Sequence, residues 1–117
     1  MIVILTGKSC VGKDKVREGL GERGYKKLIS YTTRPIRNGE VNGIDYWFVD
    51  DVVMKHYRNA GRILDYREYK VSNGEIWGYG HFKVNKSIFE DTVYIGIADL
   101  DGAEAFKKEY GDECRII

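Results

Sequence analysis

Short apolar runs, separated by polar stretches that contain glycine, recur along the whole chain. Ile2–Leu5 is an apolar run with the β-branched bias of a buried strand, and Thr92–Ala98 is a second such run. Apolar and polar residues alternate over residues 63–71, and Asn73-Gly74 predicts a hairpin turn before a return strand. The predicted strands and extended segments cover residues 2–5, 25–30, 45–49, 63–71, 76–82, 92–98 and 115–117.

Three other segments have the spacing of helices. Residues 15–22 place apolar side chains four apart and stop before Gly24, and residues 50–59 have an acidic first turn. A third helix is predicted to begin at Asp101, where Asp-Gly-Ala-Glu resembles a capping box, and to end at Gly111. Residues 31–43 are predicted to form a polar loop.

Strands that alternate with helices predict an α/β fold with a mainly parallel core sheet flanked by helices. The hairpin over residues 63–82 adds a small antiparallel insertion. We expect one domain, with its core in residues 1–30 and 92–117 and the insertion in about 31–82.

Composition narrows the functional class. The 117 residues are 43% hydrophobic and 32% charged, with a formal net charge of +1, so neither nucleic acid nor an anionic membrane is expected as a partner. No apolar run approaches the roughly 20 residues of a membrane span, and the apolar start is too short for a secretory signal. The two cysteines, Cys10 and Cys114, suit a reducing compartment, and we expect a cytoplasmic protein.

A glycine-rich stretch between the first strand and the first helix predicts a phosphate-binding loop. Its Gly-x-x-x-x-Gly-Lys spacing lets backbone N–H groups surround phosphate oxygens at a helix N-terminus. Lys13 is expected to reach the outer phosphates of ATP, whereas Asp14 replaces the usual Ser or Thr and is expected to act on Mg²⁺ or its waters. The candidate ATP-phosphate residues are Gly7, Lys8, Ser9, Cys10, Val11, Gly12, Lys13 and Asp14.

A second motif, Ser30 to Phe48, resembles the signature of guanylate kinases nearly position for position. The family pattern is Ser-x-Thr-Thr-Arg-x-x-Arg-x-Gly-Glu-x-x-Gly-x-x-Tyr-x-Phe, and this chain keeps its spacing without a gap. Arg34, Arg37 and Tyr46 make a chemically sensible cradle for a monophosphate, because arginine presents a planar fork of donors. The alternative is a solvated loop with two surface arginines. The resemblance implies a phosphate-loop NTPase fold with ATP and GMP as ligands, Ser30 at the guanine, and Lys13, Arg34 and Arg37 as catalytic residues.

The resemblance continues at Gly61-Arg62-Ile63-Leu64-Asp65-Tyr66-Arg67-Glu68, which is similar to the family's Gly-x-Phe-Leu-Glu-x-x-Glu. The resemblance implies that Glu68 reads guanine. The chemistry agrees, since one carboxylate can accept both adjacent donors of guanine and adenine offers no such pair. The alternative is a solvent-facing strand residue.

Tyr79-Gly80 resembles the family's Tyr-Gly-Thr/Ser, which implies that Tyr79 contacts the phosphate. The third position is His81, whose N–H is predicted to replace the lost hydroxyl at the guanine carbonyl. The match could also slip to Trp77-Gly78-Tyr79.

Asp99 follows the strand over 92–98 and matches the second aspartate of the family's Asp-Ile-Asp-x-Gln-Gly. Its position implies a role at Mg²⁺ or its waters. We assign the helix N-cap to Asp101. The two histidines, His56 and His81, are far apart in sequence and lack a cysteine partner pattern, so no other metal site is expected.

The resemblance covers the first part of a guanylate kinase only. The family continues into an arginine-rich lid and an adenine-binding segment that this sequence does not contain. We therefore weigh three hypotheses: phosphorylation of GMP by ATP with Mg²⁺, a non-catalytic nucleotide- or protein-binding module, and an inactive fragment.

Overall fold

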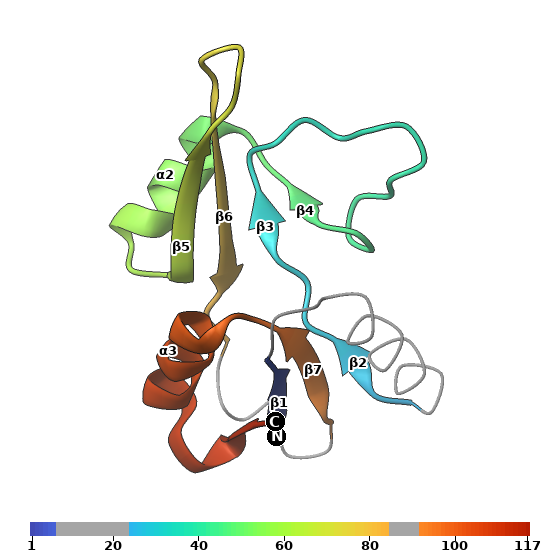
Figure 1. Ribbon diagram of the computed structural model, residues 1–117, viewed down its shortest axis with the longest axis vertical. Helices are drawn as coiled ribbons and strands as arrows, with labels where there is room; N and C mark the ends of the chain where they lie inside the picture. The colour runs from blue at the N-terminus through green and yellow to red at the C-terminus, as the bar shows by residue number, and fades with distance from the viewer. Residues whose placement is uncertain (7–23, 85–91) are drawn as a thin grey trace. The chain divides into compact units, whose positions relative to one another are not determined.

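The computed structural model describes residues 1–6, 24–84 and 92–117. The predicted phosphate loop and the predicted helix over 15–22 lie outside these ranges. The chain divides into two units: residues 1–28 together with 84–117, and residues 29–83 (Figure 1).

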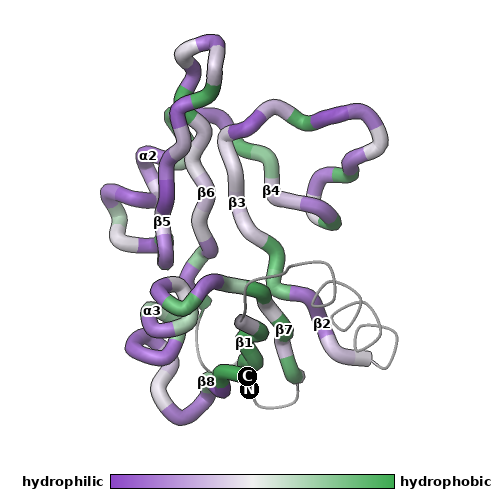
Figure 2. Tube along the Cα trace, viewed as in Figure 1, coloured by the Kyte–Doolittle hydropathy of each residue, from purple (hydrophilic) through white to green (hydrophobic). Residues whose placement is uncertain are grey.

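The first unit is built on a parallel sheet. Its strands, in the order β2-β7-β1-β8, are β2 (Lys26–Lys27), β7 (Tyr94–Ile97), β1 (Ile2–Leu5) and β8 (Cys114–Ile116). Ile4 pairs with Gly96 on one side and with Ile116 on the other. Strand β1, which is apolar throughout, appears green in Figure 2, as expected for a central strand of a buried parallel sheet. This arrangement confirms the predicted mainly parallel core sheet, although β2 is much shorter than the predicted strand over 25–30.

Helix α3 (Leu100–Tyr110) packs its apolar side chains into the same unit, with Ala103 and Phe106 buried. Its N-cap is Asp99, and the prediction that Asp101 caps it was wrong. The Asp99 backbone is extended and its Oδ1 accepts a hydrogen bond of 2.9 Å from the Gly102 amide. The first helical residue is therefore Leu100, one residue before the predicted start. Asp101 lies in the first turn, where its negative charge favours the helix dipole. A 3-10 turn, η2 (Gly111–Glu113), follows the helix and leads into β8.

The second unit is a four-stranded, mostly antiparallel sheet in the order β4-β3-β6-β5. Its strands are β4 (Trp47–Phe48), β3 (Tyr31–Thr32), β6 (Ile76–Phe82) and β5 (Ile63–Lys70). Only β3 and β4 pair in parallel. The prediction of a loop starting at Tyr31 was wrong for its first two residues, because the completely buried Thr32 hydroxyl bonds to the Gly78 carbonyl of β6 and fixes β3 in the sheet.

The hairpin of β5 and β6 follows the sequence prediction closely. Gly74 has a φ of +89°, which a glycine adopts without strain, and Asn73 accepts a hydrogen bond from the Glu75 amide. Val71 then donates to the Glu75 carbonyl and closes the ladder at 2.9 Å.

Helix α2 (Asp51–Asn59) covers one face of this second sheet. Asp50 caps it through the Val53 amide, and the Tyr57 ring meets the rings of Tyr31 and Phe82 edge-on, at 6.0 and 5.0 Å. We call this side the helix face. Because side chains alternate along a strand, Thr32 and Tyr79 point to the other side, which we call the Tyr79 face.

Strand β5 contains a bulge at Asp65 and Tyr66. Leu64 pairs with His81 and Arg67 with Tyr79, so two residues of β5 lie opposite the single Gly80. Asp65 has a φ of +54°, which is uncommon for a residue other than glycine. The bulge therefore resets which side chains point to each face of the sheet.

None of the helices in the described part of the chain is long and apolar enough to cross a bilayer.

Candidate nucleotide-binding site

Arg34 is the central charged residue of the second unit, and its backbone is fixed by the end of β3. Its amide donates to the Thr32 hydroxyl at 3.1 Å, and that hydroxyl in turn donates to the Gly78 carbonyl. The side chain is only 5% exposed. A buried guanidinium requires a charged partner, because an unpaired charge in this environment is very costly.

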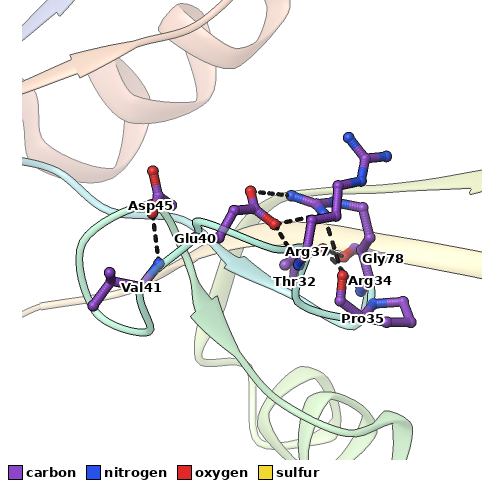
Figure 3. Close-up of polar contacts among 8 residues, drawn as sticks. All are labelled: Thr32, Arg34, Pro35, Arg37, Glu40, Val41, Asp45 and Gly78. Atoms are coloured by element: carbon purple, nitrogen blue, oxygen red, sulfur yellow. Dashed lines mark hydrogen bonds and ion pairs between the residues drawn. The ribbon is translucent and has the colours of Figure 1, made fainter.

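Glu40 is that partner (Figure 3). Its two carboxylate oxygens accept from Nη1 and Nη2 of Arg34 at 2.9 and 2.8 Å, a bidentate geometry. Hydrogen bonding from Arg34 holds the pKa of Glu40 down at about 2, and the same bonds raise the pKa of Arg34. Nη1 also donates to the Pro35 carbonyl at 3.2 Å.

Arg37 lies on the same loop but is exposed. Its amide donates to Oε1 of Glu40 at 2.8 Å, while its guanidinium points away from that carboxylate (Figure 3). The guanidinium carbon is 5.9 Å from the centroid of the Trp77 ring. The two predicted phosphate arginines therefore differ: one is buried and held, and the other is solvated.

Aromatic rings line the space around Arg34. Its guanidinium carbon lies 5.3 Å from the centroid of Tyr46 and 5.7 Å from that of Phe48. The rings of Tyr46 and Tyr79 are 5.9 Å apart, and Tyr79 makes a small further contribution to the raised pKa of Arg34. Arg34 and Tyr46, predicted from one motif, and Tyr79, predicted from another, thus come together on the Tyr79 face.

Ser30 and His81 form a second pair of predicted residues in contact. The Ser30 hydroxyl and Nε2 of His81 are 2.9 Å apart in a hydrogen bond, and His81 is 9% exposed. Since His81 lies two residues beyond Tyr79 on β6, its side chain points to the Tyr79 face.

Glu68 lies on the opposite side of the sheet from these residues. It pairs with Gly78, whereas the preceding Arg67 pairs with Tyr79, so Glu68 points to the helix face. There it accepts from the Tyr66 hydroxyl at 2.8 Å and pairs with Arg58 of α2 at 3.4 Å. It lines a cavity of about 570 Å³ between α2 and the hairpin. The pKa of Tyr66 is raised to about 12, mainly by burial and to a smaller extent by the hydrogen bond to Glu68.

Asp65 is a carboxylate that our sequence analysis did not select. The bulge turns it toward Arg67, whose Nε donates to Oδ1 at 3.2 Å, and Arg67 lies on the Tyr79 face. Asp65 is 18% exposed. The signal was present in the sequence, because Asp65 stands at the acidic position of Gly-x-Phe-Leu-Glu, three residues before Glu68.

Comparison with known proteins settles the family. The family described as "Guanylate kinase" matches residues 1–108. This chain belongs to the guanylate kinase family.

Curated members resemble the chain at a moderate level of identity. Guanylate kinases of Lactobacillus acidophilus and Enterococcus faecalis are 31% and 32% identical over 115 residues, and that of Helicobacter pylori is 32% identical over 117 residues. These matches cover 96 to 98% of this chain but only 55% of each relative. The chain thus spans about half the length of the curated guanylate kinases that it matches.

A solved structure supports the fold. The guanylate kinase of Anaplasma phagocytophilum superposes with a TM-score of 0.67 at 23% identity, over 99% of this chain and 57% of that one. The parallel sheet with flanking helices is therefore the guanylate kinase fold, a phosphate-loop NTPase architecture.

The donor side of the candidate site is described only in part. Gly7 to Asp14, including Lys13 and Cys10, lie outside the described residues. Asp99 follows β7, and the Ala98 amide bonds to the Leu5 carbonyl at 3.2 Å, so Asp99 lies beside the end of β1 that leads to Gly7. Within residues 1–6, 24–84 and 92–117, no cluster of three or more His, Cys, Asp or Glu residues could hold a metal ion.

Proposed function

We propose that the Tyr79 face of residues 29–83 binds GMP and that the chain transfers a phosphoryl group from ATP to it. The observation that carries this proposal is the environment of Arg34. A buried, permanently charged guanidinium is held rigidly by Glu40 next to the rings of Tyr46 and Tyr79. Such a group suits a phosphate monoester, because its donors are already ordered and little entropy is lost on binding.

Arg34, Arg37, Tyr46 and Tyr79 would hold the GMP phosphate. Arg34 supplies a fixed donor edge, and the exposed Arg37 can swing toward the ligand. Ser30 and His81 would face the base, with the His81 N–H directed at the guanine carbonyl oxygen.

For the carboxylate that reads guanine we propose Asp65 rather than Glu68. Asp65 lies on the same face as Tyr79 and His81, whereas Glu68 is engaged with Arg58 and Tyr66 on the helix face. A non-glycine residue with positive φ in a bulge also fits a functional role, since bulges next to active sites re-aim particular side chains.

On the donor side we propose that Lys13 and the amides of residues 7–14 hold the ATP phosphates. Asp14 and Asp99 would bind Mg²⁺ or its waters, and the exposed carboxylate of Asp99 is suited to an outer-shell contact. When bound, the ion neutralises charge that develops on the phosphates. The chain's own groups form no covalent intermediate: they position the acceptor and offset its charge.

We also propose a cytoplasmic location and no nucleic-acid partner. Cys114 is a free, buried thiol, which suits a reducing compartment, and the net charge of +1 gives no electrostatic case for a polyanion as the main partner.

The test is calorimetry with GMP and AMP, followed by a coupled assay for ADP with ATP·Mg²⁺. Binding of GMP in preference to AMP, with ADP production, supports the kinase. Preferential GMP binding without ADP production supports the non-catalytic module instead. Equal affinity for GMP and AMP would contradict guanine recognition at this site.

A further inference from the structure

Glu40 links the two arginines of the candidate phosphate site. Its carboxylate accepts two bonds from the Arg34 guanidinium and one from the Arg37 amide. The Glu40 amide donates back to the Arg37 carbonyl at 3.0 Å, so residues 37–40 form a turn closed from both sides. One side chain thus sets the orientation of Arg34 and the path of the backbone at Arg37.

The geometry also determines which edge of Arg34 remains for a ligand. A guanidinium has an end edge, made of Nη1 and Nη2, and a side edge, made of Nε and the outer hydrogen of Nη2. Glu40 takes the end edge, and the Pro35 carbonyl takes the second Nη1 hydrogen. The side edge is a second fork that matches two oxygens of a phosphate.

We propose that Glu40 is a positioning residue for phosphate capture, and this inference rests on the proposed function. By occupying the end edge of Arg34, Glu40 directs the side edge to the phosphate and keeps the turn that carries Arg37 in a binding-ready conformation. Its negative charge opposes an anionic ligand, so its contribution to affinity comes from order and not from net electrostatics.

Two effects therefore compete when Glu40 is neutralised. Glu40→Gln retains the shape of the side chain but places an amide N–H₂ group against the donors of Arg34, so the bidentate pair is lost. If order dominates, GMP affinity falls; if long-range charge dominates, GMP affinity rises because Arg34 is no longer compensated. The sign of the change distinguishes the two.

The experiment compares GMP with guanosine, which lacks the phosphate, in titrations followed by the fluorescence of Trp47 and Trp77. We expect Glu40→Gln to weaken the binding of GMP roughly tenfold, which is the size of one charge-assisted contact. The binding of guanosine should weaken less than about twofold. Glu40→Asp is too short for the full bidentate pair and should fall in between. Asp45→Asn is the matched control, because Asp45 caps the Val41 amide in the same loop at 2.7 Å and bonds to neither arginine (Figure 3).

The outcomes separate the positioning role of Glu40 from the proposed function. Unchanged or tighter GMP binding in a folded Glu40→Gln chain would overturn the positioning role while leaving the proposed function intact. An equal loss for GMP and guanosine would show that Glu40 acts only on the fold, which also overturns it. A wild-type chain that binds neither ligand would refute the proposed function itself, and the role of Glu40 with it.

Discussion

Thr32 offers a sharp test of how β3 supports the site. Its side chain is fully buried, its hydroxyl donates to the Gly78 carbonyl at 2.9 Å, and it accepts from the Arg34 amide at 3.1 Å. Thr32→Val keeps the volume but removes both bonds. The Gly78 carbonyl still accepts from the Thr33 amide at 3.0 Å, so the main cost is one buried, unsatisfied amide at Arg34.

That cost is about 1–3 kcal/mol, the usual penalty for such a group. We therefore expect Thr32→Val to lower the free energy of unfolding by about 2 kcal/mol. Thr32→Ser is the matched control: it keeps the hydroxyl and loses one buried methyl group, which is worth about 1 kcal/mol. Urea denaturation followed by tryptophan fluorescence measures both. A valine variant as stable as the wild type, or more stable than the serine variant, would refute this account of Thr32.

Three further predictions concern the site. Asp65→Asn should reduce the preference for GMP over AMP at least tenfold in calorimetry, since a lost bond to a charged group costs roughly 1.5–3 kcal/mol. Glu68→Gln should leave that preference within about twofold. A large loss of preference in Glu68→Gln with a small one in Asp65→Asn would assign recognition of the base to Glu68. His81→Ala should weaken GMP by about 1 kcal/mol in the same titration, the net value of one hydrogen bond, and an unchanged affinity would remove His81 from the base site. Because its pKa is about 2 in the folded chain against an ordinary 4.5, Glu40 stabilises the fold fully above about pH 4.5 and progressively less as pH falls toward 2. The urea midpoint of the wild type should therefore drop more between about pH 5 and about pH 3 than that of Glu40→Gln, and parallel drops would contradict the linkage.

Much of the fold could be predicted from local patterns. The hairpin was predictable because Asn73-Gly74 stands between two alternating runs, and β1 and β7 were predictable because both are continuous apolar runs. Strand β3 was missed because its two residues, Tyr31 and Thr32, are held by long-range pairing with β6 and by no local pattern. The helix start was missed because Asp99 and Asp101 are both good N-caps, and only the backbone geometry separates them.

The site residues show the same division. Arg34, Tyr46 and Tyr79 were predictable from motif spacing and lie together. The directions of the Asp65 and Glu68 side chains were not predictable from the sequence. The alternation of side chains along β5 is interrupted at the bulge, and no pattern in a single sequence predicts this bulge. A residue's chemistry could be read from the sequence, but its direction could not.

The hydrogen bond between Ser30 and His81 has a consequence for protein engineering with the second unit. The unit begins at Ile29 and ends at Lys83, and its first and last strands, β3 and β6, are antiparallel neighbours, so the chain enters and leaves at adjacent points. The hydrogen bond between Ser30 and His81, 2.9 Å long, links the entering and leaving segments of the chain. Both ends of the segment therefore lie close together. It could therefore be inserted into another protein, where a ligand that contacts Ser30 or His81 would bind next to the two points of attachment.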